Sequence, residues 1–194
     1  NLFAPKNLLP FASFIYFSHK DNSYMNDQIN TIDIVFEFIK KIECKPVILR
    51  LNEIWNNEKY KIESQSLEFW KKSYENISEY EKKDYLNSYS EVQLNEIFKV
   101  FQQRIFEKNS RFIIKLIRVV PFLNFFKKIN FYITDLDSYF IYDIKKGFVN
   151  VNIKKKNDVI EIHSSSLFFL MKFEFGFDTL TVNGLFNSNF KNFS

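Results

Sequence analysis

Residues 148–154 read FVNVNIK, and this stretch decides the fold of the C-terminal half. Its apolar and polar side chains alternate, a period of two that is typical of a β-strand with one buried face: Val149, Val151 and Ile153 against Asn150, Asn152 and Lys154. The same period marks residues 129–135, 139–144 and 159–163. Residues 145–147 and 156–158 have the composition of hairpin turns. Because short turns join antiparallel neighbours, we predict a separate antiparallel sheet here.

Helices are expected to cover this sheet. Ser164 to Ser166 can cap a short helix over 167–173, Gly176 would end it, and residues 180–186 read as a last strand. The C-terminal half is therefore predicted to be an α+β module. An apolar cavity between helix and sheet would favour lipid binding. With so many phenylalanines, we expect that space to be filled, by Phe168, Phe169 and Phe173.

The N-terminal part has the pattern of an α/β unit. Residues 8–18 and 45–51 are apolar runs that suit buried strands. Between them, apolar residues recur at helical spacing over 32–43, after a cap at Asn30 or Thr31. Strand, helix and strand form a βαβ-like unit, which implies a sheet with further strands.

The middle of the chain is helical. Residues 64–77 and 90–108 read as amphipathic helices, and residues 112–126 as an apolar helix broken before Pro121. We therefore predict an α/β segment over 1–56, a helical connecting segment over 57–128 and an α+β module over 129–194. The chain opens at Asn1 without the features of a domain start, so we expect the C-terminal fragment of a longer protein.

Composition limits the function classes. A formal net charge of +4, with basic and acidic residues interspersed, does not predict a nucleic-acid binder. Cys44 is the single cysteine, which excludes an internal disulfide and a cysteine metal cluster. No apolar run reaches the roughly 20 residues that span a bilayer, and no signal peptide opens the chain. The expected location is the cytoplasm, and a homo-oligomer is left open.

Candidate chemistry gathers in one polar loop after the first apolar run. It contains an imidazole, carboxylates and amides that could bind a substrate or a metal, or could simply hydrogen-bond within a turn. The residues expected to bind substrate are His19, Asn22, Tyr24 and Asn26. The other histidine, His163, is expected at the surface or as a cap. Asp135 and Asp137 could be paired carboxylates, but their spacing favours a turn. The sequence contains neither a glycine-rich phosphate loop nor an H-E-x-x-H motif.

Several segments together resemble a known family. They are residues 10–14 (PFASF), 24–26 (YMN), 45–49 (KPVIL) with Trp55, and 176–186 (GFDTLTVNGLF). They resemble the last part of metallo-β-lactamase-fold proteins, in the branch of CMP-N-acetylneuraminate hydroxylase-like and lactonase-like enzymes. The last segment also resembles sterol-carrier-like domains appended to such enzymes.

The resemblance implies an αββα sandwich whose C-terminal part lies in this chain, and a metal-dependent hydrolase or hydroxylase. The full-length enzyme would hold zinc, iron or manganese and act on a small anionic or sugar-linked substrate. The family's histidine-rich motif is absent here, so late ligation would fall to His19 or Glu53, or be missing. This chain alone is then expected to bind no catalytic metal. The alternative is a non-enzymatic module that binds a lipid or a partner.

Overall fold

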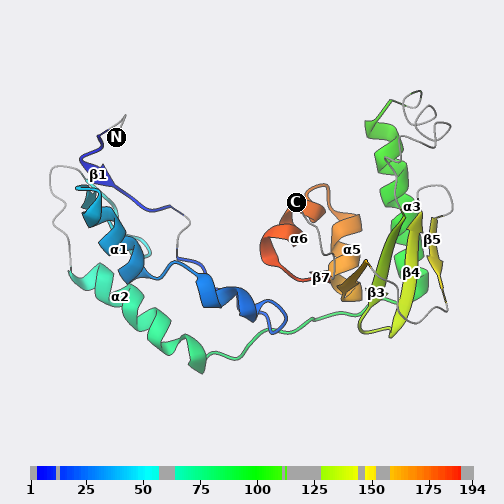
Figure 1. The fold of residues 1–194 in the computed structure, drawn as a ribbon, viewed down its shortest axis with the longest axis horizontal. Coiled ribbons are helices and arrows are strands. Elements are labelled where there is room, and N and C mark those ends of the chain that lie inside the picture. The colour runs from blue at the N-terminus through cyan, green and yellow to red at the C-terminus, as the bar shows by residue number, and fades with distance from the viewer. Residues whose placement is uncertain are drawn as a thin grey trace. The chain divides into compact units, whose positions relative to one another are not determined.

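The structure is a computed structural model, and it describes residues 4–11, 14–56, 64–110, 112, 128–143, 147–151 and 158–188. The chain divides into two compact units, unit 1 (Asn1–Lys83) and unit 2 (Asp84–Ser194) (Figure 1). The expected mixture of helices and strands is confirmed. The predicted helix over 112–126, apart from Phe112, and the lysine run at 154–156 lie outside the described residues.

Unit 1 is built around one amphipathic helix. This helix, α1 (Ile32–Lys41), matches the prediction and buries Ile32 and Ile39. A second helix, α2 (Ser64–Glu75), continues into a 3₁₀ turn, η2 (Asn76–Glu79). The Lys71 ammonium lies 2.7 Å from the Asp33 carboxylate and joins α2 to α1. The polar loop forms another 3₁₀ turn, η1 (Ser23–Gln28).

The two long strands expected in unit 1 are wrong in extent. Strand β1 spans Asn7–Leu8 and pairs in parallel with β2, Lys45–Pro46. Beyond β1 the apolar run is only partly covered, because Phe11 is 88% exposed and Ile15 48% exposed. Among the described residues no third strand joins this pair. A strand needs a neighbour on at least one side to satisfy its backbone groups, and these apolar runs lack one over most of their length.

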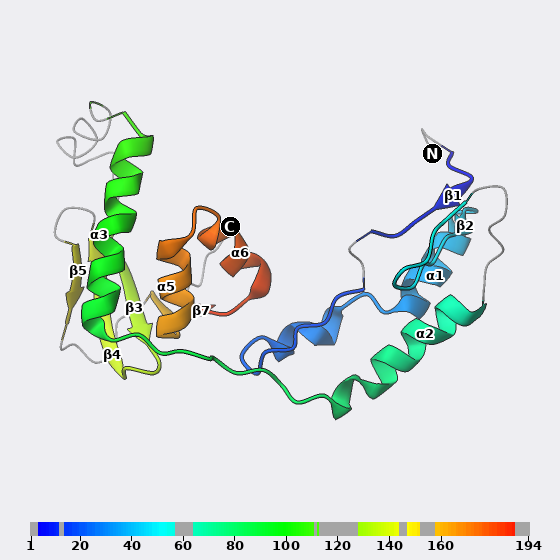
Figure 2. The ribbon, with the colours of Figure 1, turned by 180° about the vertical axis from the view of Figure 1, so that it is seen from behind.

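Unit 2 contains one long helix and a five-stranded sheet. Helix α3 (Glu91–Lys108) begins at a capping box between Ser90 and Gln93. Strand order in the sheet is β5-β4-β3-β6-β7. The strand bounds are β3 Ile129–Ile133, β4 Ser138–Asp143, β5 Gly147–Asn150, β6 Val159–Ile162 and β7 Asn187–Ser188. Figure 2 shows α3 running along this sheet.

The sheet is mixed, which corrects the expectation of an antiparallel one. The pairs β3–β4, β4–β5 and β6–β7 are antiparallel, but β6 pairs in parallel with β3. The hairpin expected between the strands at 148–153 and 159–163 is therefore wrong, since β5 and β6 are not neighbours in the sheet. Only pairing decides which strands a connection joins.

Two helices follow the sheet where one helix and a strand were expected. Helix α5 (Ser164–Lys172) is followed by α6 (Gly176–Asn183), so the strand predicted over 180–186 is wrong. Gly176 begins α6 rather than ending α5. A Cβ atom at Gly176 would lie 2.5 Å from the Leu170 carbonyl oxygen, so glycine permits close packing of the two helices. Gly184, at φ 64°, ends α6.

The core of unit 2 lies between the sheet and its helices. It gathers ten buried residues from α3, the sheet, α5 and α6: Leu94, Phe98, Phe131, Ile133, Phe140, Phe148, Ile162, Leu167, Met171 and Leu180. Among the described residues, no helix is both long and apolar enough to cross a membrane.

Candidate functional site: an apolar cavity in unit 2

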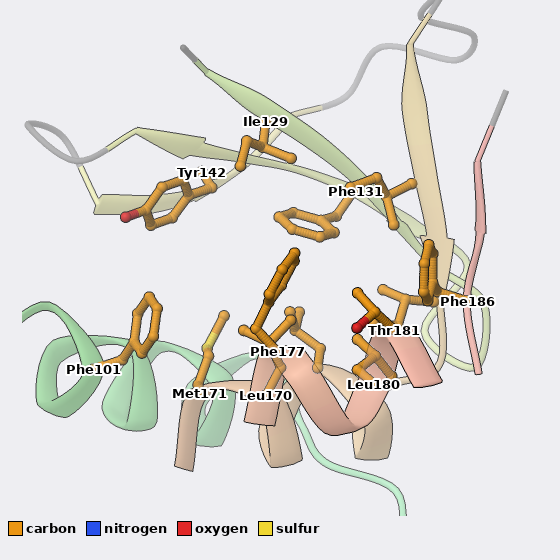
Figure 3. A pocket seen from close by; sticks show the side chains of 13 residues that line it. Phe101, Ile129, Phe131, Tyr142, Leu170, Met171, Phe177, Leu180, Thr181 and Phe186 are labelled. Atoms are coloured by element: carbon orange, nitrogen blue, oxygen red, sulfur yellow. The ribbon is translucent and has the colours of Figure 1, made fainter. Parts of the chain in front are cut away.

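A cavity of about 290 Å³ opens between the sheet and the helices of unit 2 (Figure 3). One side is formed by β3, β4 and β6, and the other by α3, α5 and α6. Every side chain that lines it is apolar or aromatic except Thr181: Phe101, Ile129, Phe131, Tyr142, Ile160, Ile162, Leu167, Leu170, Met171, Phe177, Leu180, Thr181 and Phe186.

The alternation along β3 explains the sheet side of the cavity. Ile129, Phe131 and Ile133 point to one face, and the parallel partner β6 adds Ile160 and Ile162 beside them. The register places Phe131 opposite Ile160 and Ile133 opposite Ile162. The parallel partner β6 therefore adds apolar side chains to the face that β3 and its antiparallel partner β4 form.

The cavity wall presents no charge among its lining residues. Burial raises the pKa of the Tyr142 phenol, and the nearby Asp143 carboxylate raises it further, so this group is neutral at physiological pH. The Thr181 hydroxyl donates a 2.8 Å hydrogen bond to the Asp178 carbonyl oxygen. Both polar atoms belong to residues at the edge of the lining, and the remainder offers only dispersion contacts.

A hydrogen-bonded cluster fixes the start of α5 at the end of β3. The Asp135 carboxylate accepts hydrogen bonds from the Ser164 N–H at 2.8 Å and the Ser164 hydroxyl at 2.5 Å. Burial raises the pKa of Asp135, but those bonds, aided by the nearby His163, outweigh it and hold the pKa below its usual value. This carboxylate also lies favourably at a helix N-terminus. The position of α5 over the sheet, and hence the cavity, depends on this contact.

His163 caps the N-terminus of α5, which is one of the two roles expected for it. Its Nδ1 accepts a hydrogen bond from the Ser165 N–H at 3.1 Å, and its Nε2 lies 3.5 Å from an Asp135 oxygen. The ring stacks on Tyr85 with centroids 3.6 Å apart. Asp137 does not pair with Asp135: it accepts the Tyr132 hydroxyl at 2.8 Å and occupies a turn at φ 46°.

The expectation that phenylalanines fill the space between helix and sheet is wrong. Phe168, Phe169 and Phe173 are not among the described residues that line the cavity. Phe168 stacks on Tyr89, with centroids 3.8 Å apart, and Phe169 packs against Phe173 at 4.7 Å. Phe168 and Phe169 thus find aromatic partners outside the cavity lining, which periodicity along a short helix could not distinguish.

The polar loop of unit 1 holds its own backbone. Asn26 Oδ1 accepts from the Phe17 N–H at 2.8 Å, and its Nδ2 donates to the Phe17 carbonyl at 2.9 Å. Asn22 Oδ1 accepts from the His19 N–H, and His19 Nδ1 accepts from the Asp21 N–H. These bonds show that the loop is a turn held by hydrogen bonds between its own side chains and backbone. Substrate binding by His19, Asn22, Tyr24 and Asn26 stays a prediction.

Glu53 supports the local structure of unit 1. Its carboxylate accepts hydrogen bonds from the Ser66 hydroxyl at 2.6 Å and the Arg50 N–H at 2.9 Å. These two bonds hold the pKa of Glu53 below its usual value. Within the described residues no group of three histidine, cysteine or carboxylate side chains could hold a metal ion. Metal ligation by His19 or Glu53 therefore stays a prediction.

Comparison with known proteins adds no relative. No family model, no curated protein and no solved structure matches the chain. The resemblance to metallo-β-lactamase-fold enzymes, the cytoplasmic location and the homo-oligomer thus stay predictions.

Sequence reasoning found only part of the site. The alternation in residues 129–133 and 159–162 identified the apolar face, and Leu167, Leu170 and Met171 were expected over it. Phe101, Phe177 and Thr181 were missed. Phe101 had been assigned to a connecting segment and Thr181 to a strand, and Phe177 lay outside every predicted element. The glycines at 176 and 184, eight positions apart, were the available signal for a short helix between them.

Proposed function

We propose that unit 2 binds an uncharged apolar small molecule in its cavity. The observation that carries this proposal is the cavity itself, about 290 Å³ in volume and bounded by apolar side chains. The cavity supports a binding module. The alternative, a metal-dependent enzyme, rests on the sequence resemblance alone. Of the two binding roles expected from sequence, the cavity favours a lipid or another apolar ligand over a partner protein.

The volume suits a ligand of modest size. An apolar cavity of about 150 Å³ is enough to bind benzene, and ligand pockets commonly occupy about 300–1,000 Å³. A cavity of about 290 Å³ therefore accommodates a bicyclic molecule or part of an acyl chain. A charged group buried there would lose its hydration without gaining a partner among the lining residues, so the buried portion should be neutral.

The apolar lining of the cavity supports the same proposal. Apolar surface that is removed from water contributes roughly 25 cal/mol per Å². An apolar ligand that covers this lining would therefore gain free energy from burial and from dispersion contacts.

Fluorescence titration of the whole chain with N-phenyl-1-naphthylamine tests the proposal. We expect saturable enhancement near one probe per chain, and displacement by 1-decanol. The blocking variant is Leu170→Trp, because Leu170 projects into the cavity from α5 (Figure 3). We expect it to weaken probe binding about tenfold or more by occupying the space.

Phe169→Trp is the matched control. It adds the same fluorophore one position away on α5, outside the cavity lining. We expect it to leave probe affinity within about twofold, which is below 0.5 kcal/mol. Absence of saturable binding by the parent chain, or equal affinity in the two tryptophan variants, would contradict the proposal.

A further inference from the structure

The connection from α5 to α6 exposes three phenylalanines at alternate positions. They are Phe173, Phe175 and Phe177, which are 47%, 73% and 64% exposed, and together they are called the aromatic turn. Both helices that it joins form the helical side of the cavity. Phe177 belongs to the turn and to the cavity lining, and its ring projects between helices and sheet (Figure 3). The exposed aromatic surface is therefore continuous with the cavity.

Cations lie directly against the aromatic turn. The Arg104 guanidinium donates hydrogen bonds to the backbone carbonyls of Lys172, at 2.8 Å, and Phe173, at 3.4 Å. The Lys172 ammonium lies 5.4 Å from the centroid of the Phe173 ring. Long cationic side chains that lie along aromatic surface with their charged ends in water suit the boundary between headgroups and acyl chains.

The remaining charges around the turn are nearly balanced. Lys108 forms a 2.7 Å ion pair with Glu174, and Asp178 lies in the first turn of α6. Arg104, Lys108 and Lys172 together exceed the two carboxylates by one charge. Attraction to anionic lipid is therefore modest, and insertion of the rings supplies most of the affinity.

We propose that the aromatic turn docks on a phospholipid membrane surface, so that the apolar ligand passes between bilayer and cavity beside Phe177. This inference rests on the proposed function. An apolar molecule that fills the cavity would partition from water into bilayers, so its source and the cavity mouth would meet at this surface. A second copy of the chain would also cover the rings, and self-association is therefore one outcome of the test.

Vesicle co-sedimentation of the whole chain tests the docking. Vesicles contain phosphatidylcholine and phosphatidylglycerol, and the variant is Phe175→Ser. Phe175 is not among the cavity-lining residues, and it occupies the N-cap of α6 without a side-chain cap bond. Serine is a favoured N-cap, so the helix should remain intact. We expect vesicle affinity to fall about fivefold or more, since a ring is withdrawn from the interface.

The control is Val92→Ser on α3, which removes an apolar side chain that is 66% exposed but distant in sequence from the turn. We expect it to bind vesicles like the parent chain. Probe affinity in vesicle-free buffer should be unchanged in Phe175→Ser. Vesicle binding that is absent in the parent or equal in Phe175→Ser would overturn the docking. So would self-association of the parent, without vesicles, that Phe175→Ser abolishes.

The two proposals fail separately. If the parent binds N-phenyl-1-naphthylamine without vesicles but does not sediment with them, docking is wrong and the cavity function stands. If the parent binds neither, both are wrong.

Discussion

Unit 1 and unit 2 differ in how their apolar residues find partners. Unit 1 buries a small group around α1 and β2 that includes Ile32, Ile39 and Val47. Unit 2 buries ten residues between a five-stranded sheet and three helices. Both contain apolar sequence in abundance, so composition does not explain the difference. The difference comes from the number of elements that meet on one apolar face, because an apolar side chain is buried only when a second surface covers it.

The contrast also separates two sequence patterns. The continuous apolar runs of unit 1 leave Phe11 and Leu51 exposed, at 88% and 76%. The alternating segments of unit 2 place Phe131, Ile133 and Phe140 in the core. Alternation specifies which face must be covered, whereas a continuous run specifies no face. Alternation was the better guide in β3 and β4, but the expectation that Val149 lies on the buried face is wrong: in β5 Val149 is 43% exposed and Phe148 is buried instead.

The largest expected effect compares one core residue from each unit. Phe140 is 1% exposed and stacks on Phe148 with centroids 4.6 Å apart. We expect Phe140→Ala to lower the free energy of unfolding of unit 2 by about 3–5 kcal/mol. Ile39→Ala in unit 1 should cost nearer the lower end of about 2–5 kcal/mol, because fewer elements surround it.

Peptide-resolved hydrogen exchange measures the loss of stability in unit 1 and in unit 2 separately. Urea unfolding gives the accompanying change in total stability. A larger loss for Ile39→Ala than for Phe140→Ala would break the comparison, since it would show the denser core in unit 1.

The next effect concerns the carboxylate that anchors α5. Asp135→Asn should lower the free energy of unfolding by about 1.5–3 kcal/mol, the range of a hydrogen bond to a charged group. The folded pKa of Asp135 lies below its ordinary value of 3.8. Its contribution is therefore fully present above about pH 3.8 and disappears as the pH falls through the lower, folded value.

Urea midpoints measured between about pH 2 and pH 6 check both statements. Asp137→Asn is the control, because Asp137 lies two positions away and accepts the Tyr132 hydroxyl rather than groups of α5. The stability lost on acidification should be smaller in Asp135→Asn than in the control. Equal acid dependence in the two variants would mean that Asp135 is not the anchor.

The smallest effect concerns the polar anchor of unit 1. Ser66 is fully buried and donates to Glu53 at 2.6 Å. We expect Ser66→Ala to cost about 1.5 kcal/mol, the lower end of the range for a hydrogen bond to a charged group and less than Asp135→Asn, because one such bond is lost instead of two. Ser73→Ala, on the exposed side of α2, should stay within about 0.5 kcal/mol in urea unfolding. A cost for Ser66→Ala above that for Asp135→Asn would reverse the ranking of the two anchors.

Local pattern determined the elements whose signals were complete. Helix α1 followed from its apolar spacing, and α3 from its apolar stripe. Strands β3 to β6 followed from alternation and turns, within a few residues. These signals act between residues close in sequence, where backbone geometry alone fixes which side chains share a face.

Tertiary structure alone decided the pairing and the cavity. Nothing within residues 159–162 shows that they pair in parallel with 129–133, since both directions bury the same face. The short apolar segment 176–183 becomes α6 because Gly176 lets it approach α5 closely and Gly184 ends it. The cavity remains because Phe168 and Phe169 of α5 pack against Tyr89 and Phe173 instead of filling it. Its volume is a sum over side chains from seven parts of unit 2, and no local pattern specifies whether such a space is filled.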